Sequence, residues 1–278
     1  DGGSTDGSVE IIQRYASRLA WKVSEKDGGQ AEAINKGLRR ARGEYVAWLN
    51  SDDCYLPGAV SAAVRLLQAN PAVGLVYGDV YAVDAAGRRN NLMRYQQWGL
   101  KDLLCFRILG QPGVFMRRSV LEQAGYLDLS YHFLLDHQLW LRLAALAPIL
   151  YSGQTWAEAR YHEDAKNIAR AAEFGGEAFR ILEWAAVQPQ IAPTLQRHFH
   201  AARAGAERFN ARYLLDAGRE GEAWRGYLRA LKLDWREAIL EWKRILYIPF
   251  ARLGLRRLKA WVLARRRRRF AARGEEQL

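Results

Sequence analysis

The sequence predicts an α/β fold with a mostly parallel sheet and flanking helices, followed by an all-helical C-terminal region. Short strand-like runs alternate with helical apolar spacing over the first 85 residues, and glycine-rich turns separate them. From Glu163 onward the apolar spacing is helical almost throughout. With 278 residues, 50% of them hydrophobic, the chain is long enough for one sizeable core and an accessory region.

The first elements are predicted as a loop, a helix, a strand and a second helix. The turn-forming cluster DGGSTDG occupies residues 1–7, and apolar residues follow at helical spacing over 12–19. Residues 20–24 are typical of a short strand. A second helix, with its apolar face spread over 31–41, is closed by Gly43.

The next elements continue the alternation. A strand is predicted over 44–49, and Pro57 stands at a favoured early position of a third helix. A further strand covers 74–83. The buried face of the third helix is expected to comprise Val60, Ala63, Val64 and Leu67. In such sheets, ligands bind beyond the carboxyl ends of the strands.

The middle of the chain is mixed. We expect a strand over 91–95, a short helix over 98–105, a turn at the GQPG segment and a helix over 136–146. Further on, residues 203–233 have the pattern of a helix pair of the kind found in helical-repeat proteins.

Composition argues against several classes of protein. The best candidate for a membrane span, residues 143–157, is short and is interrupted by polar residues and a proline. The two cysteines, Cys54 and Cys105, lie in no metal-binding pattern, so neither a disulfide framework nor a zinc site is indicated. No signal peptide is recognisable at the start. These features predict a cytoplasmic protein.

Polar residues follow directly after the strand predicted over 44–49. Asn50, Asp52 and Asp53 lie at its end, where a strand buried on both faces leaves the sheet. Close carboxylates repel each other unless a cation intervenes, which favours a divalent metal. The alternative is an acidic turn that caps the following helix.

Three segments together resemble one family. DGGSTDGS at 1–8, DGGQAEAINKGLRRARGEYVAWLNSDD at 27–53 and GYLDLSYHFLLDHQLWLRLA at 125–144 resemble the family 2 glycosyltransferases, which are inverting enzymes with the Rossmann-like GT-A fold. The resemblance covers roughly residues 1–165. It implies transfer of a sugar, with inversion, from a nucleotide-sugar donor, expected to be a UDP-sugar, to a glycan or lipid-linked acceptor in surface polysaccharide synthesis.

The resemblance also implies how the chain is divided. Family members begin with a strand, a helix and a strand before the DGGSTDG loop, and we expect these elements to be missing here, which would leave a gap in the sheet. We therefore predict an N-terminally incomplete GT-A domain at 1–165, a helical accessory region at 166–234 and a basic amphipathic tail at 235–278.

On the donor side, the resemblance implies roles for four residues besides the metal ligands: Asp1, Asp27, Asn50 and Asp53. Asp1 would contact the nucleobase and Asp27 the nucleotide or sugar, with Gln30 and Asn35 in the same loop and helix. Asn50 stands where the family usually has an acid, so a hydrogen bond to the ribose or sugar is expected from it. Asp53 would support the loop or touch the sugar.

The family resemblance also implies a metal. NSDD at 50–53 is similar to the DxD element, in which Asp52 would bind a divalent ion that bridges the donor phosphates. The ion neutralises the leaving nucleoside diphosphate. Hard oxygen ligands favour Mn²⁺ or Mg²⁺. His162 is similar to a family position that completes the metal shell, although a lone histidine is more often a surface residue.

The resemblance makes Asp136 the general base. Inversion requires a group that takes the proton of the acceptor hydroxyl, and a carboxylate is usual in sugar chemistry. Leu135 and Gln138 stand where the family often has further acids. The alternative is that Asp136 only caps the helix that follows it.

Other residues are expected on the acceptor side. Gln111 and Pro112, in the GQPG turn, resemble the family segment that lines the acceptor. Arg117 and Arg118 follow, and either a phosphate contact or an ordinary exposed helix start is open for them.

The C-terminal tail carries most of the excess charge. Residues 241–278 contain twelve Lys or Arg against three Glu, which is nine of the twelve net positive charges. Tryptophans interleaved with basic residues predict a helix that lies on an anionic membrane surface, at the inner face of the cell membrane. The alternative is ordinary packing with an exposed basic end. Nucleic acid is not expected as a partner, because no recognised nucleic-acid fold accompanies the charge.

Two functions of different classes follow. The first is a metal-assisted, nucleotide-sugar-dependent glycosyltransferase of the hexosyltransferase type. The second is a non-catalytic membrane- or partner-binding module derived from the same fold, suggested by Asn50, Gln138 and the missing N-terminal elements. Metal-dependent binding of a nucleoside diphosphate would separate the two.

Overall fold

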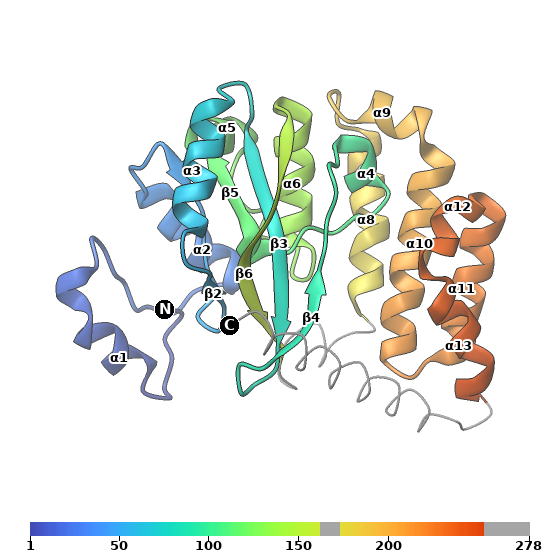
Figure 1. Ribbon diagram of the computed structural model, residues 1–278, viewed down its shortest axis with the longest axis horizontal. Coiled ribbons are helices and arrows are strands. Elements are labelled where there is room, and N and C mark those ends of the chain that lie inside the picture. The colour runs from blue at the N-terminus through green and yellow to red at the C-terminus, as the bar shows by residue number, and fades with distance from the viewer. Residues whose placement is uncertain (162–172, 253–278) are drawn as a thin grey trace.

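A mixed sheet forms the centre of the molecule in the computed structural model, which describes residues 1–161 and 173–252 (Figure 1). The sheet is 6-stranded, with the order β1-β5-β3-β6-β2 and with β4 paired to β3. The strands are β1 (Tyr45–Val46), β2 (Cys54–Tyr55), β3 (Leu75–Val83), β4 (Arg89–Met93), β5 (Val114–Arg117) and β6 (Ile149–Arg160).

The α/β fold class with a helical C-terminal region is confirmed, but the sheet is less parallel than predicted. Among the described pairs, β3 and β6 are parallel, whereas β1–β5, β2–β6, β3–β4 and β3–β5 are antiparallel. The turn between β3 and β4 is too short for a crossover, so β4 must reverse direction. Alternation of helices and strands along the sequence does not reveal such reversals.

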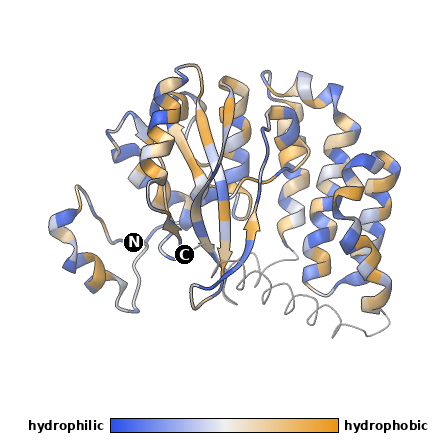
Figure 2. Ribbon diagram, in the orientation of Figure 1, coloured by the Kyte–Doolittle hydropathy of each residue, from blue (hydrophilic) through white to orange (hydrophobic). Residues whose placement is uncertain are grey.

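Strand β3 divides the core into two layers. Leu75 and Tyr77 belong to the main cluster, together with Leu139 and Leu143 of α6 (Leu135–Leu146). Val76 belongs to a second cluster on the opposite face, where it meets the residues of α3 (Ala59–Ala69). Side chains of a strand alternate between its two faces, so one strand supplies both layers. Figure 2 shows orange stretches on the central strands and alternating orange and blue on the helices around them.

The N-terminal segment differs from the prediction. Its helix α1 (Ser8–Arg14) begins earlier than expected and is followed by a 3₁₀ turn at Ala16–Arg18. The strand predicted over 20–24 is extended chain instead. Its described backbone pairing is limited to Asp1, whose nitrogen donates to Val23 O at 3.0 Å and whose oxygen accepts from Glu25 N at 3.1 Å. Two such bonds do not make a ladder.

The helices around the sheet begin near the predicted places. The described helices of this part are α2 (Gln30–Arg40), α3, α4 (Leu100–Leu104), α5 (Arg118–Ala124) and α6. Helix α3 starts at Ala59, after Gly58 with a φ of 80°, and not at Pro57. Ala59, Ala63 and Leu67 face the core, while Val60 is 49% exposed. The prediction that Val60 belongs to the buried face was therefore wrong, and Ala59 takes that place.

Helices continue to the end of the described chain and stand beside the sheet, at the side of α4 and α6 (Figure 1). They are α8 (Phe174–Ala186), α9 (Ala192–Arg197), α10 (Phe199–Asp216), α11 (Glu220–Leu233), α12 (Trp235–Ala238) and α13 (Trp242–Arg252). The helix pair expected over 203–233 is therefore confirmed. Within 1–161 and 173–252, no helix has the length and apolar character that a membrane crossing requires.

The C-terminal helices share the main core with the sheet. Phe174 and Ile181 of α8 and Phe209 of α10 belong to the same cluster as Tyr77 and Trp140. Another cluster, with Leu214 and Leu215 of α10, Tyr227 of α11 and Ile248 of α13, holds the outer helices together. The boundaries predicted at 165 and 234 stay predictions, and the apolar core runs across the first of them.

A buried group of charges closes this region. Arg208, 3% exposed, donates to Cys105 O at 2.9 Å and to Glu241 Oε1 at 3.3 Å. Glu241 also accepts from Arg212 and from Tyr227 Oη. Burial by itself would raise the pKa of Glu241, but the adjacent arginines, above all Arg212, lower it to about 2. Glu241, in the 3₁₀ turn after α12, therefore neutralises the positive charges of Arg208 and Arg212 on α10.

We expect Glu241→Ala to lower the free energy of unfolding by about 3–5 kcal/mol, because it removes a buried carboxylate that pairs with the buried Arg208 and the partly buried Arg212. Urea unfolding at pH 7 measures this. Since the pKa of Glu241 falls from its ordinary 4.5 to about 2, its contribution is present above pH 4.5 and is lost as the pH falls toward 2.

The matched control is Glu222→Ala, which removes the exposed pair with Arg219 and should cost less than about 1 kcal/mol. Equal costs for the two variants would show that the buried group does not stabilise the fold.

Candidate active site

Asn50 is the centre of a hydrogen-bond network in the loop after β1, because the strand predicted over 44–49 is limited to Tyr45–Val46 in the structure. Its side chain accepts from Gln30 Nε2 at 3.3 Å and donates to Asp53 Oδ2 at 3.1 Å and to Gln111 Oε1 at 3.2 Å. Gln111 Nε2 in turn donates to Trp48 O at 2.8 Å. The network joins the start of α2, the NSDD loop and the 3₁₀ turn at Gln111–Gly113, which are far apart in the sequence.

Arg160, the last residue of β6, fixes the other side of this loop. Its backbone nitrogen donates to Asp53 Oδ1 at 2.9 Å, and its Nε donates to Asp52 O at 3.1 Å. Its Nη1 reaches Asp84 O at 3.1 Å and Ala85 O at 2.9 Å, in the turn after β3. No motif in the sequence marks Arg160, and only its place at the end of β6, a strand that was not predicted, brings it to this loop.

Asp52 and Asp53 are adjacent and partly buried. Burial raises the pKa of Asp53, and the neighbouring charge of Asp52 raises it further against the bonds from Arg160 and Asn50. Asp53 therefore has a loop-supporting position, one of its two predicted roles. Its side chain accepts from two donors that fix it in the loop, which makes Asp53 a poor candidate for a metal ligand.

The donor set around NSDD fits a shared metal rather than a preformed cage. In the described part of the chain, no group of three or more His, Cys, Asp or Glu is arranged to hold an ion. Mg²⁺ and similar ions are often bound by one or two carboxylates together with substrate phosphates. Asp52 supplies a carboxylate of this kind. The other predicted ligand, His162, lies outside the described residues.

Asp1 and Asp27 lie together at a separate groove. Asp1 Oδ2 accepts from Gly3 N and Ser4 N, each at 3.0 Å, and from Ser24 Oγ at 2.6 Å. Both acids line a groove of about 320 Å³, with the apolar side chains of Ile12, Leu19, Trp21 and Val23 among its walls. An acid at an apolar groove is compatible with a nucleobase contact, and both donor assignments stay predictions.

Asp136 lies in the first turn of α6, but it does not cap the helix. Leu134 is the residue at the cap position, and Asp136 Oδ1 accepts from the backbone N–H of the next residue, His137, at 2.7 Å. The alternative role of Asp136, as no more than the cap of this helix, is therefore contradicted. Burial raises the pKa of Asp136 to about 6, and the nearby charge of Glu177 contributes in the same direction.

Helix α6 is held from two sides. His137, fully buried, makes a 3.0 Å hydrogen bond between its Nε2 and Leu103 O, and burial lowers its pKa to about 4. Trp140 stacks on Trp48, with ring centroids 5.2 Å apart. Because Trp48 precedes the NSDD loop, this contact connects the helix that carries Asp136 with the loop that carries Asp52.

The two departures around Asp136 have structural explanations. Gln138 is 1% exposed and accepts from Arg142 Nε at 3.0 Å. Arg142 also donates to Ala124 O at 2.8 Å and Tyr126 O at 2.7 Å. Leu135 is likewise buried. Gln138 therefore belongs to a packing network, and its amide says nothing against catalysis.

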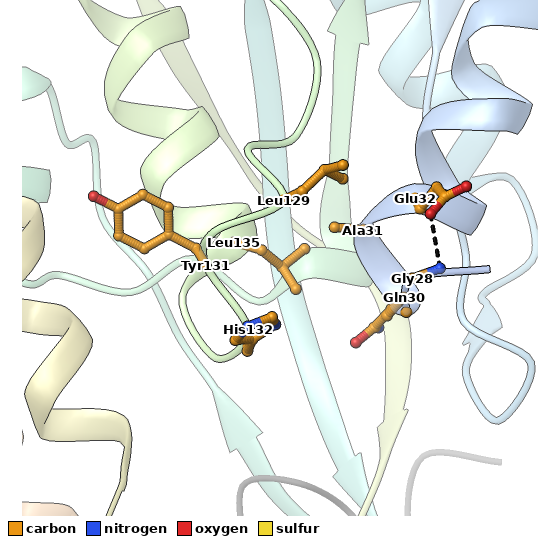
Figure 3. A pocket seen from close by; sticks show the side chains of 9 residues that line it. Gly28, Gln30, Ala31, Glu32, Leu129, Tyr131, His132 and Leu135 are labelled. Carbon is orange, nitrogen blue, oxygen red and sulfur yellow. Dashed lines mark hydrogen bonds between the residues drawn. The ribbon is translucent and has the colours of Figure 1, made fainter.

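A small cleft lies between the starts of α2 and α6. Figure 3 shows the side chains of Gln30 and His132 at the same end of it. Its volume is about 20 Å³, enough for one water molecule and too little for a sugar. The lining residues are Gly28, Gly29, Gln30, Ala31, Glu32, Leu129, Tyr131, His132 and Leu135. The cleft brings the Asn50 network next to the chain that precedes Asp136.

The remaining predicted residues separate into two groups. Gln111 presents its amide to the network, while Pro112 is buried, so the acceptor-side prediction depends on Gln111. Asn35 exchanges two hydrogen bonds with the backbone of Leu127, at 2.8 and 2.9 Å, and ties α2 to the main core.

The two arginines after β5 have structural partners. Arg117 Nη2 donates to Leu67 O at 2.9 Å, and Arg118 Nε donates to Gly43 O at 2.8 Å. Each also pairs with a glutamate, Glu44 and Glu122 respectively. Of the two readings that the sequence left open, these contacts favour packing over a phosphate role.

Comparison with known proteins agrees with this geometry. Residues 1–125 match the family model described as Glycosyl transferase family 2. The chain contains a family 2 glycosyltransferase domain. The resemblance stated from the motifs is thereby confirmed, and the match ends before Asp136 and before all the C-terminal helices.

One relative and two solved structures illustrate this glycosyltransferase domain. The O-antigen biosynthesis protein RfbC of Myxococcus xanthus is 30% identical over 148 residues, which are 52% of this chain and 12% of that protein. S. aureus TarS in complex with UDP-GlcNAc has a TM-score of 0.55 and 15% identity, covering 91% of this chain and 81% of that one. The mannosyltransferase PcManGT from Pyrobaculum calidifontis, in complex with GDP-Man and Mn²⁺, has a TM-score of 0.57 and 18% identity, covering 95% and 75%.

The solved structures and the curated relatives support different conclusions about this chain. At such identities the two solved structures establish the fold, which is the GT-A fold expected from the motifs. The chain spans less than a third of the length of the first curated relatives that it matches. Activity, substrates and partners therefore belong to the proposal that follows.

Proposed function

We propose that the protein transfers a sugar from a nucleotide-sugar donor, a UDP-sugar, to a glycan or lipid-linked acceptor with inversion, in surface polysaccharide synthesis. The observation that carries this proposal is the partly buried Asp136, with a pKa of about 6, on a helix whose Trp140 stacks on Trp48, just before the NSDD loop. The family 2 domain supports sugar transfer, and the O-antigen protein RfbC supports a surface glycan.

Asp52 holds the metal in this proposal, and Asn50 and Asp53 hold the loop around it. Mn²⁺ or Mg²⁺ suits the oxygen ligand of Asp52, and PcManGT was solved with Mn²⁺. When bound, the ion neutralises charge on the departing nucleoside diphosphate. Asp1 and Asp27 receive the nucleotide at their groove, and Gln111 faces the acceptor.

Asp136 takes the proton of the acceptor hydroxyl. As the acceptor oxygen bonds to the anomeric carbon, the bond from that carbon to the diphosphate oxygen breaks, and the proton passes to the Asp136 carboxylate and then to solvent. A pKa near the working pH makes a carboxylate an effective base while it remains ionised. His137, with its pKa lowered to about 4 by burial, stays neutral at pH 7 and does not take part in proton transfer.

The non-catalytic module is the contrasting function. Asn50, which suggested it, is fully engaged with Gln30, Asp53 and Gln111, so its amide has a structural use in an active enzyme too. Screening UDP-, GDP- and dTDP-sugars for metal-dependent release of the nucleoside diphosphate separates the two. Binding of nucleotide with no release from any donor would favour the module.

We also propose that the end of the chain rests on an anionic membrane at the inner face of the cell membrane. Six large apolar side chains in the last described helices are 41–59% exposed: Trp235, Ile239, Leu240, Trp242, Leu246 and Phe250. Arg236 lies over Trp235 and Lys243 over Trp242, which puts cations beside the exposed aromatic rings. Apolar and basic groups side by side suit a lipid surface. The arginine run at 265–269 lies outside the described residues.

Asp52→Ala is expected to abolish Mn²⁺-dependent binding of UDP, because it removes the carboxylate that the metal shares with the phosphates. Titration calorimetry with UDP, with and without MnCl₂, measures the difference. Asp128→Ala, at an acid outside the network, is the matched control and should bind as the unaltered protein does. Metal-dependent affinity that survives in Asp52→Ala would move the metal elsewhere.

Asp136→Asn is expected to keep UDP affinity but to lower turnover by about 10²–10⁴-fold, the usual contribution of a general base. In the unaltered enzyme, kcat/KM should fall as the pH drops through about 6, because the carboxylate is then protonated. A pH series of nucleotide release measures both. Retained turnover in Asp136→Asn would refute the assignment.

The membrane proposal predicts that replacing Trp242, Leu246 and Phe250 together by Gln weakens binding to phosphatidylglycerol vesicles by at least about tenfold, since the removed side chains would insert into the interface. Cosedimentation measures the binding, and raised salt should weaken it in the intact chain. Truncation is unsuitable, because it would remove Glu241 from the buried arginines.

The control combines Ile11→Gln, Val60→Gln and Val187→Gln, at apolar residues that are 49–74% exposed elsewhere on the molecule, and it should leave binding unchanged. Full binding by the first triple variant, or indifference of the intact chain to lipid charge, would contradict the membrane proposal.

A further inference from the structure

One carboxylate from the C-terminal helices reaches the chain that leads into α6. Glu177 of α8 accepts from three consecutive backbone N–H groups: His132 N at 2.6 Å, Phe133 N at 2.8 Å and Leu134 N at 2.8 Å. The last of these residues occupies the cap position of α6, two residues before Asp136. No side chain within α6 or its cap satisfies these donors in the described structure.

Two neighbours of Glu177 on α8 hold the same loop. Arg180 lies over the ring of Tyr131 at 4.9 Å and directs two nitrogens at Ser130 O, at 3.3 and 3.4 Å. Phe174 packs against Phe133 with ring centroids 4.8 Å apart. Phe174, Glu177 and Arg180 are spaced by three residues, so one face of α8 runs along residues 130–134.

Burying the carboxylate of Glu177 costs free energy unless hydrogen-bond donors or opposite charges compensate it. Its side chain is 5% exposed, and ionised groups in such places need partners. The partners are the three N–H groups and the positive end of α6, which attracts negative charge. Asp136 lies at the same end of α6, so the carboxylate of Glu177 holds the backbone that leads directly to Asp136.

We propose that Glu177 is a positioning residue for the general base: its carboxylate fixes the backbone of residues 132–134 and thereby the orientation of the first turn of α6 and of Asp136. This inference rests on the proposed role of Asp136. It assigns a part in the reaction to α8, which lies outside the residues matched by the family model.

Glu177 also adds negative charge near the base. The titratable groups described around Asp136 are Glu177 of α8, Tyr213 of α10, Tyr95 after β4 and His137 of α6 itself. Of these four groups, Glu177 is the one that carries a carboxyl group, and its charge raises the pKa of Asp136. Replacing it with a neutral side chain should therefore make Asp136 easier to ionise, which moves the acidic limb of kcat/KM to lower pH.

The test compares Glu177→Gln with Glu183→Gln, an exposed acid further along α8. UDP release from UDP-GlcNAc, UDP-glucose and UDP-galactose with MnCl₂ is followed across pH, together with UDP affinity. Glu177→Gln should lower kcat by at least about tenfold, keep UDP affinity within about twofold and shift the acidic limb downward. Glu183→Gln should match the unaltered protein in all three.

Glu177→Asp is the conservative variant, because it keeps the charge and shortens the side chain. It should leave the acidic limb in place and lower kcat less than Gln does. If Glu177→Gln does not fold, Glu177→Asp decides alone: reduced kcat at unchanged UDP affinity supports the inference. Unaltered kcat in a folded Glu177→Gln, or a loss confined to UDP affinity, would overturn it.

The same assays separate this inference from the proposed function. Turnover retained in Asp136→Asn would remove the base itself, whatever Glu177 does. An inactive Asp136→Asn together with a fully active Glu177→Gln would leave the function standing and would remove only the positioning role.

Discussion

The stacking of Trp48 on Trp140 is the contact on which the arrangement of the site depends. Trp48 precedes the loop with Asp52, and Trp140 lies one turn after Asp136, so two aromatic rings set the relation between the two acids. Offset stacking of large rings is favourable and limits how the rings can slide. Seven of the twelve residues of α6 are buried, which leaves the helix little freedom to move away from that contact.

Buried polar side chains carry the rest of the arrangement, and each joins segments distant in the sequence. Asn35 binds the backbone of Leu127, Asp79 accepts from Tyr95 N and Tyr151 Oη, and Arg208 reaches Cys105 O. A satisfied polar group in a low-dielectric interior restricts geometry more than an apolar contact does. The helices after residue 173 are thus part of the same mechanical unit as the sheet.

The sequence predicted many of the elements and marked candidate acids, but it predicted neither β5 nor β6 and did not reveal the contacts that connect the elements. Strand β3 and helix α6 were predictable from the pattern of their apolar residues, whereas Asp52 and Asp136 stand out only as candidates, through the motifs that surround them. The direction of β5, the extended chain at 20–24 and the exposed Val60 depend on tertiary pairing. Arg160 and Glu177 make their hydrogen bonds to residues far away in the sequence, and no local spacing reveals such partners.

The buried ion pairs of α10 have a consequence for synthesis of the chain on the ribosome. Arg208 and Arg212 emerge before Glu241, which supplies their counter-charge. At Gly205 a Cβ would overlap Cys105 O, so α10 must approach that backbone closely to dock. Docking with uncompensated guanidinium groups is unfavourable. These charges are therefore compensated only after Glu237 and Glu241 have been made, and we expect a nascent chain that stops before them to leave α10 undocked, with its apolar residues accessible to chaperones.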